Sequence, residues 1–122
     1  MSWLGDLIKP REKVIPRSLS DEDFRKAVHT AGKPVIADFH SPSCGPCKRL
    51  VPILIDVATD YADQVEVVAV DVRNAPKTTR RFSIRATPTV VIFDGGKEVG
   101  RFTGYRPKKW FQEMIAKEFG EA

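Results

Sequence analysis

The sequence predicts an α/β fold with a central mixed β-sheet flanked by helices on both faces. Apolar runs of strand length alternate with amphipathic stretches at helical spacing, which is typical of parallel strands joined by helices. The last two strand candidates are instead joined by the tight turn Asp94-Gly95-Gly96-Lys97, which predicts an antiparallel hairpin. Together these two features predict a sheet that contains both kinds of strand pairing.

The expected elements follow from the position of each apolar run. In the first half of the chain they are an edge strand at 14–19, a helix opened by Ser20-Asp21-Glu22-Asp23 and ended by Gly32, a buried strand at 34–39, a helix at 48–61 and a second buried strand at 65–72. In the second half they are a short helix at 74–82, strands at 89–93 and 98–102, and a helix at 107–119. Ser20 and Asp23 have the spacing of a capping box.

Length and composition indicate one soluble domain. The chain has 122 residues, 42% of them apolar and 30% charged, which is enough for a single core. It contains no apolar run of roughly 18 residues and no secretory signal, so we expect a cytoplasmic protein. The net charge of +4 comes from 20 basic and 16 acidic residues, without aromatic residues interleaved among the basic ones. Nucleic-acid binding is therefore not expected.

Residues 1–12 are expected to form an extension in front of a domain of residues 13–122. The apolar residues of this segment recur at helical spacing: Trp3, Leu4, Leu7 and Ile8. A segment of this length is too short for a stable isolated helix. It either docks on its own domain, lacks order, or contacts a membrane surface or a partner.

The two cysteines, Cys44 and Cys47, lie where a strand gives way to a helix. Unpaired N–H groups and the positive end of the helix dipole stabilise a thiolate there, and the thiolate is the nucleophile of disulfide exchange. Cys44 is expected to attack, and Cys47, one turn into the helix, to resolve the mixed disulfide. An inert pair or half of a metal site shared by two chains remain alternatives, although a tetrahedral site needs about four ligands and no second cysteine pair exists.

An ordered set of motifs at characteristic spacing resembles the thioredoxin family over about residues 14–119. The motifs are Asp38-Phe39, Cys44-Gly45-Pro46-Cys47-Lys48, Pro52, Thr87-Pro88-Thr89, the Asp94-Gly95-Gly96-Lys97 turn and Gly104. The resemblance implies the thioredoxin fold and the reduction of protein disulfides by a Cys44–Cys47 couple, with no cofactor or metal besides this pair. It also implies a thioredoxin reductase as partner and, by analogy, a monomer.

Further site residues follow from the same resemblance. Asp38 is similar to the family's buried aspartate, which accepts the proton of the second cysteine; the alternative is a carboxyl that is merely hydrogen-bonded at a strand end. Pro88 matches the family's cis-proline, and a trans proline opening a strand is the alternative. The expected substrate-binding residues are Thr87, Pro88, Gly104, Gly45 and Pro46, although Gly104 could also be a simple turn glycine.

The chain departs from the family pattern at three positions. Ser43 and His40 stand where tryptophans are usual, and Ala69 stands where many members have a lysine next to the buried aspartate. Without that lysine, the Asp38 carboxyl should be harder to ionise. A binding module that uses the fold and residues 1–12 to hold one partner, with redox turnover secondary or absent, is the alternative function.

Overall fold

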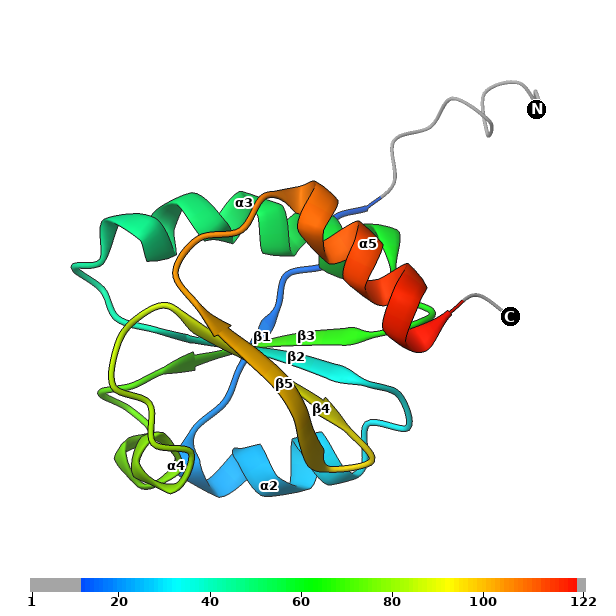
Figure 1. The fold of residues 1–122 in the computed structure, drawn as a ribbon. Helices are drawn as coiled ribbons and strands as arrows, with labels where there is room; N and C mark the ends of the chain where they lie inside the picture. The colour runs from blue at the N-terminus through cyan, green and yellow to red at the C-terminus, as the bar shows by residue number, and fades with distance from the viewer. Residues whose placement is uncertain (1–11, 121–122) are drawn as a thin grey trace.

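A five-stranded sheet with the strand order β1-β3-β2-β4-β5 forms the middle layer of the computed structural model (Figure 1). The structure describes residues 12–120. In that range β1 and β2 each pair with β3 in parallel, whereas β4 pairs antiparallel with both β2 and β5. The strands are β1 (Arg17–Ser18), β2 (Val35–His40), β3 (Glu66–Asp71), β4 (Thr89–Asp94) and β5 (Lys97–Thr103). The predicted mixed sheet is confirmed.

Helices cover both faces of this sheet, as the sequence predicted. Figure 1 shows α3 and α5 on one face and α2 and α4 on the other. Their bounds are α2 (Asp21–His29), α3 (Gly45–Asp60), α4 (Pro76–Arg81) and α5 (Lys108–Phe119). Within residues 12–120, no helix has the length and apolar character needed to cross a membrane.

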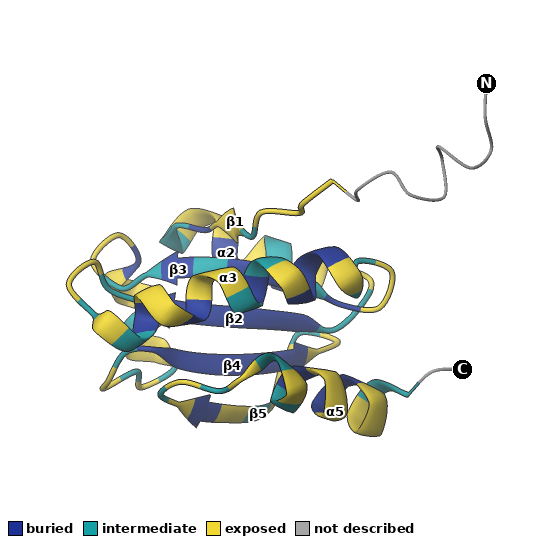
Figure 2. Ribbon diagram, turned by 90° about the horizontal axis from the view of Figure 1, so that it is seen from above, coloured by how far each residue is buried: buried dark blue, intermediate teal, exposed yellow. Residues whose placement is uncertain are grey.

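The core has two halves, one on each side of the sheet, and the central strands β2 and β4 are buried along their length (Figure 2). Alternate residues of β2 face opposite sides. Ile36 packs in the half beneath α3 and α5, whereas Phe39 packs in the half beneath α2. Asp38 has the parity of Ile36, so the strand directs its carboxyl toward α3 rather than toward α2.

Three local predictions at the N-terminal end were wrong in detail. Only Arg17 and Ser18 form the expected edge strand, because Pro16 lacks the N–H that a ladder requires. The Ser20 hydroxyl donates to the Asp23 carboxylate at 3.0 Å and makes no cap bond to the backbone, so the capping box does not form. Helix α2 ends at His29, before Gly32, and Thr30 occupies the C-cap position.

The carboxylate of Asp21 joins α2 to α4. Its Oδ1 accepts hydrogen bonds from the backbone N–H and the hydroxyl of Thr78, both at 2.8 Å, and its Oδ2 accepts one from the backbone N–H of Lys77 at 3.1 Å. The first turn of a helix leaves such N–H groups without intrahelical partners. Asp21 therefore caps α4 from a distant part of the chain.

Residues 1–11, which include most of the predicted extension, lie outside the described residues.

Candidate active site

The two cysteines lie at the N-terminus of α3 and form a disulfide, with their Cα atoms 5.2 Å apart. Cys44 is the N-cap residue in extended conformation, and Gly45 and Pro46 are the first two residues of the helix. The backbone N–H of Cys47 donates to the Cys44 sulfur at 3.1 Å. Pro46 has no N–H, and no hydrogen bond is lost, because N–H groups in the first turn of a helix have no intrahelical carbonyl to donate to. The helix terminus thus directs a hydrogen bond and its positive dipole end at Cys44.

The two sulfurs differ in their access to solvent. Cys47 is only 3% exposed, whereas Cys44 is half-buried in the loop that precedes the helix. An incoming disulfide can therefore reach the sulfur of Cys44 and not that of Cys47.

A second loop contacts Cys44 from the opposite side. The Thr87–Pro88 peptide bond is cis, as the resemblance implied, and the Thr87 carbonyl oxygen lies 3.4 Å from the Cys44 sulfur. In the disulfide this sulfur carries no hydrogen, so the approach is a contact; the reduced thiol can donate a hydrogen bond across it. The backbone N–H of Gly104 donates to the Pro88 carbonyl at 2.8 Å. Gly104 therefore flanks the same loop as Thr87 and Pro88.

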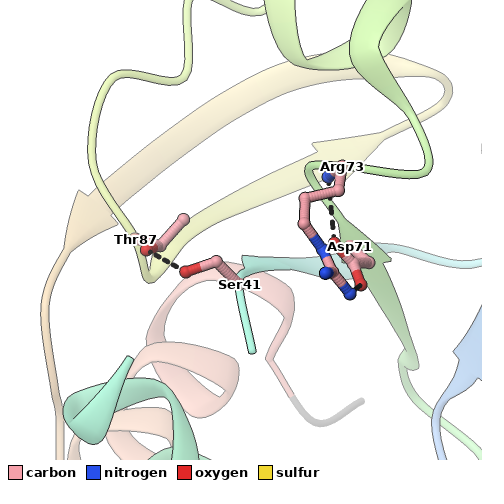
Figure 3. A network of polar contacts seen from close by, with 4 residues as sticks. All are labelled: Ser41, Asp71, Arg73 and Thr87. Atoms are coloured by element: carbon pink, nitrogen blue, oxygen red, sulfur yellow. Dashed lines mark hydrogen bonds and ion pairs between the residues drawn. The ribbon is translucent and has the colours of Figure 1, made fainter. Parts of the chain in front are cut away.

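One polar contact ties the two loops together and was missed by the sequence reasoning. The hydroxyl oxygens of Ser41 and Thr87 lie 3.0 Å apart, and Figure 3 shows the two side chains pointing toward each other. Ser41 directly follows β2, three residues before Cys44. The only sequence signal was a hydroxyl residue beside the cysteine loop.

At the end of β3, the Arg73 guanidinium donates to the Asp71 carboxylate at 3.2 Å and lowers its pKa (Figure 3).

Asp38 is the buried carboxyl that the sequence singled out. The residue is 4% exposed, and its Oδ1 has no hydrogen-bond partner among residues 12–120. Burial raises the pKa of this carboxyl to about 7, because the charged form loses its hydration. On the neighbouring strand Ala69 stands opposite Asp38 and supplies no charge to offset the effect. The alternative of a carboxyl satisfied at a strand end does not fit the described residues.

Asp38 and Cys47 line one pocket of about 260 Å³ on the α3 side of the sheet. His40 and Ala69 line it as well. Within the described part of the chain, no group of three or more His, Cys, Asp or Glu side chains is arranged to hold a metal ion. The arrangement brings the buried carboxyl of Asp38 and the second cysteine to the same cavity.

Comparison with known proteins matches the thioredoxin family model to residues 15–117. The chain belongs to the thioredoxin family. It is 37% identical to a thioredoxin of Alicyclobacillus acidocaldarius, over 81% of this chain and 93% of that protein. It is 35% identical to thioredoxin 1 of Synechococcus elongatus, over 84% of this chain and 96% of that protein. It is also 31% identical to a bifunctional thioredoxin reductase/thioredoxin of Mycobacterium leprae, over 87% of this chain and 23% of that protein.

Family membership and the cysteine pair together establish the activity. The protein is a thiol–disulfide oxidoreductase of the thioredoxin type, and its redox centre is the Cys44–Cys47 disulfide, a group of the protein itself. No observation on the described residues favours the alternative of a binding module without redox turnover. The three departures from the family pattern surround this centre: Ser43 precedes Cys44, whereas His40 and Ala69 line the pocket of Asp38.

Proposed function

We propose that the reduced protein attacks disulfides of other proteins through the Cys44 thiolate. The observation that carries this assignment is the half-buried Cys44 sulfur at the helix N-cap, next to a Cys47 that is almost fully buried. Cys44 displaces one sulfur of the substrate and forms a mixed disulfide. Cys47 then attacks the Cys44 sulfur, which releases the second substrate thiol. Two electrons pass to the substrate, and the Cys44–Cys47 disulfide forms.

Asp38 is the proposed proton acceptor for Cys47. A thiol must lose its proton before it attacks, and a base is most useful when its pKa lies near the working pH. The pKa of about 7 for Asp38, and the pocket it shares with Cys47, support this role. Its carboxyl takes up the Cys47 proton as the mixed disulfide is resolved and returns it to solvent afterwards.

The proposed substrate-binding surface surrounds Cys44. The N–H of Thr87 donates to no group within residues 12–120, so it is available to pair with an extended substrate backbone as in strand addition. The hydrogen bond from the Gly104 N–H to the Pro88 carbonyl holds this loop, and Gly45 and Pro46 flank the sulfur on the helix side. A bound peptide would thus present its disulfide to the accessible sulfur.

The remaining assignments are proposals from family membership. The partner that re-reduces the disulfide is a thioredoxin reductase; the relative in which a thioredoxin reductase and a thioredoxin form one protein supports such a pairing. The protein would act in the cytoplasm as a monomer, within electron transport that maintains redox balance, and needs no cofactor or metal. Residues 13–122 form the working domain, with residues 1–12 as an extension.

Reduction of insulin tests the proposed function. Wild-type protein recycled by dithiothreitol is expected to accelerate insulin precipitation, and Cys44→Ser is expected to remove the acceleration. Cys47→Ser serves as the matched control, because it retains the attacking thiol and should accumulate a mixed disulfide visible by mass spectrometry. Equal rates for the wild type and Cys44→Ser would contradict the proposal.

A further inference from the structure

The pocket beside Asp38 resembles a small-molecule binding site in its size and its apolar lining. Its volume of about 260 Å³ lies just below the roughly 300–1,000 Å³ of typical small-molecule sites. Most of the apolar residues that line it come from the segment before β1, from α3 and from β3: Ile15, Pro16, Val51, Leu54, Ile55 and Ala69. Ile15 and Val51 are exposed, so apolar surface continues from the pocket to its rim.

Among the charged residues that line this pocket, Asp38 is the buried one. Asp38 lines the cavity and is only 4% exposed. Its Oδ1 has no hydrogen-bond partner in the described part of the chain. Buried polar groups in folded proteins are almost always hydrogen-bonded, so this carboxyl is an exception that needs a reason. A hydrogen-bond donor entering the pocket would supply the missing partner.

The other titratable groups around the pocket do not already supply it. His40 from β2 and Lys48 and Cys47 from α3 line the cavity, whereas β3 contributes only the uncharged Ala69. Lys48 is an exposed residue on the helix surface. The pKa of Asp38 is raised by burial, with no neighbouring charge acting on it. The carboxylate is therefore left without a counter-charge by the side chains of residues 12–120.

We propose that this pocket binds a primary ammonium group carried on a short alkyl stem, the chemistry shared by a free alkylamine and by a lysine side chain of a partner protein. An ammonium offers three hydrogen-bond donors and the opposite charge to the carboxylate. Its alkyl stem lies along the apolar walls while the charged head reaches Asp38, in the way that lysine stems cover apolar surface. Binding requires no turnover of the cysteines, and it occupies the carboxyl that is the proposed proton acceptor for Cys47.

The test is a titration of the full chain with n-butylammonium chloride, followed by NMR of the Asp38 carboxyl carbon. The protein is kept in the disulfide form, in which the cysteines do not titrate. With a pKa of about 7, Asp38 is ionised in roughly a tenth of the molecules at pH 6 and nine-tenths at pH 8. Because only the ionised form makes the ion pair, the apparent Kd is expected to be about tenfold lower at pH 8.

Two probes and two variants control this titration. Sodium chloride at equal ionic strength and n-butanol, which has the stem without the charge, should leave the Asp38 signal unsaturated. Ala69→Leu fills the pocket and should abolish saturation. Asp38→Asn, followed through its side-chain amide carbon, should abolish the pH dependence. The proposal is overturned if n-butylammonium gives no saturable shift beyond that of sodium chloride, if n-butanol binds equally, or if the wild-type Kd is the same at both pH values. The wild-type comparisons stand even if a variant fails to fold.

A second titration distinguishes the two sources of the ligand. Nα-acetyl-lysine methylamide carries the same ammonium and stem on a peptide backbone. Saturation by both compounds shows that the pocket accepts a lysine side chain on a peptide backbone, whereas saturation by n-butylammonium alone restricts it to free alkylamines.

Discussion

The hydroxyl groups of Ser41 and Thr87 make a hydrogen bond of 3.0 Å between residues that are 46 positions apart in the chain. Ser41 lies at the end of β2, three residues before Cys44, and the Thr87 carbonyl contacts the Cys44 sulfur at 3.4 Å. The bond therefore links the two loops that must keep their spacing for a peptide to be held against the sulfur. Ser41 acts through Thr87 and is a positioning residue.

Ser41→Ala tests this link. Loss of one hydrogen bond between partly buried hydroxyls costs about 0.5–1.5 kcal/mol. We expect the free energy of unfolding to fall by this amount. We also expect the KM for insulin to rise about two- to tenfold while kcat changes little. Ser43→Ala is the matched control, since the Ser43 hydroxyl is exposed and makes no hydrogen bond within the described residues. An unchanged KM in Ser41→Ala would rule out the positioning role.

The burial of Asp38 predicts how stability depends on pH. The folded carboxyl keeps its proton up to about pH 7, whereas the unfolded one loses it near 3.8. The folded state thus binds more protons between these values, so the free energy of unfolding should fall as the pH rises through this window. Each pKa unit corresponds to about 1.4 kcal/mol, which makes the total loss about 4 kcal/mol.

Asp38→Asn should remove this loss, because the amide is neutral at every pH. The variant is expected to be more stable than the wild type at pH 8 by up to about 4 kcal/mol, with the difference shrinking toward pH 5. Urea unfolding of the disulfide form at several pH values measures it. Asp94→Asn, at an exposed strand end, is the control. A stability difference that is independent of pH would show that Asp38 does not titrate as described.

The same variant should be slower in chemistry. A positioned general base contributes roughly 10²–10⁴-fold, and water can partly replace it, so we expect Asp38→Asn to slow resolution of the mixed disulfide by about 10²-fold. Stopped-flow release of a chromophoric thiol from a mixed disulfide at Cys44 measures this step. The wild-type rate should rise with pH through an inflection near 7 that the variant lacks. A variant that kept the inflection would assign it to another group.

The cap supplied by Asp21 to α4 predicts a stability effect far from the cysteines. Asp21→Ala leaves the first-turn N–H groups of Lys77 and Thr78 without their acceptor, and the urea midpoint should fall. Asp23→Ala removes a carboxylate that accepts a solvent-exposed hydrogen bond from the Ser20 hydroxyl, and it should change the midpoint much less. Equal midpoints for the two variants would show that the cap contributes nothing.

Features that depend on local pattern were predicted from the sequence. The position of Cys44 and Cys47 at a helix start follows from spacing and hydrophobic periodicity, and the structure places them there. The burial of Asp38, which the structure also has, was implied by the resemblance to the thioredoxin family. Local signatures misled where side chains had a choice of partner. Ser20 and Asp23 fit a capping box, yet the hydroxyl bonds the carboxylate directly.

Features set by the tertiary arrangement could not be predicted. The Ser41–Thr87 bond and the Asp21 cap join segments that only the folded sheet brings together, and no spacing along the chain encodes them. The pocket beside Asp38 likewise depends on Ile15 and Val51, which come from separate segments. The sequence indicated Ala69 as a missing charge but not the cavity that opens beside it.

The reduction potential of the Cys44–Cys47 couple tests the central claim most directly. The protein would be equilibrated in defined dithiothreitol redox buffers, its free thiols trapped, and the oxidised fraction read from the mass shift. A reductase of the thioredoxin type predicts a potential near −270 mV, at which many cytosolic disulfides are reduced. A value above about −200 mV, or failure of the two cysteines to form their disulfide, would contradict it.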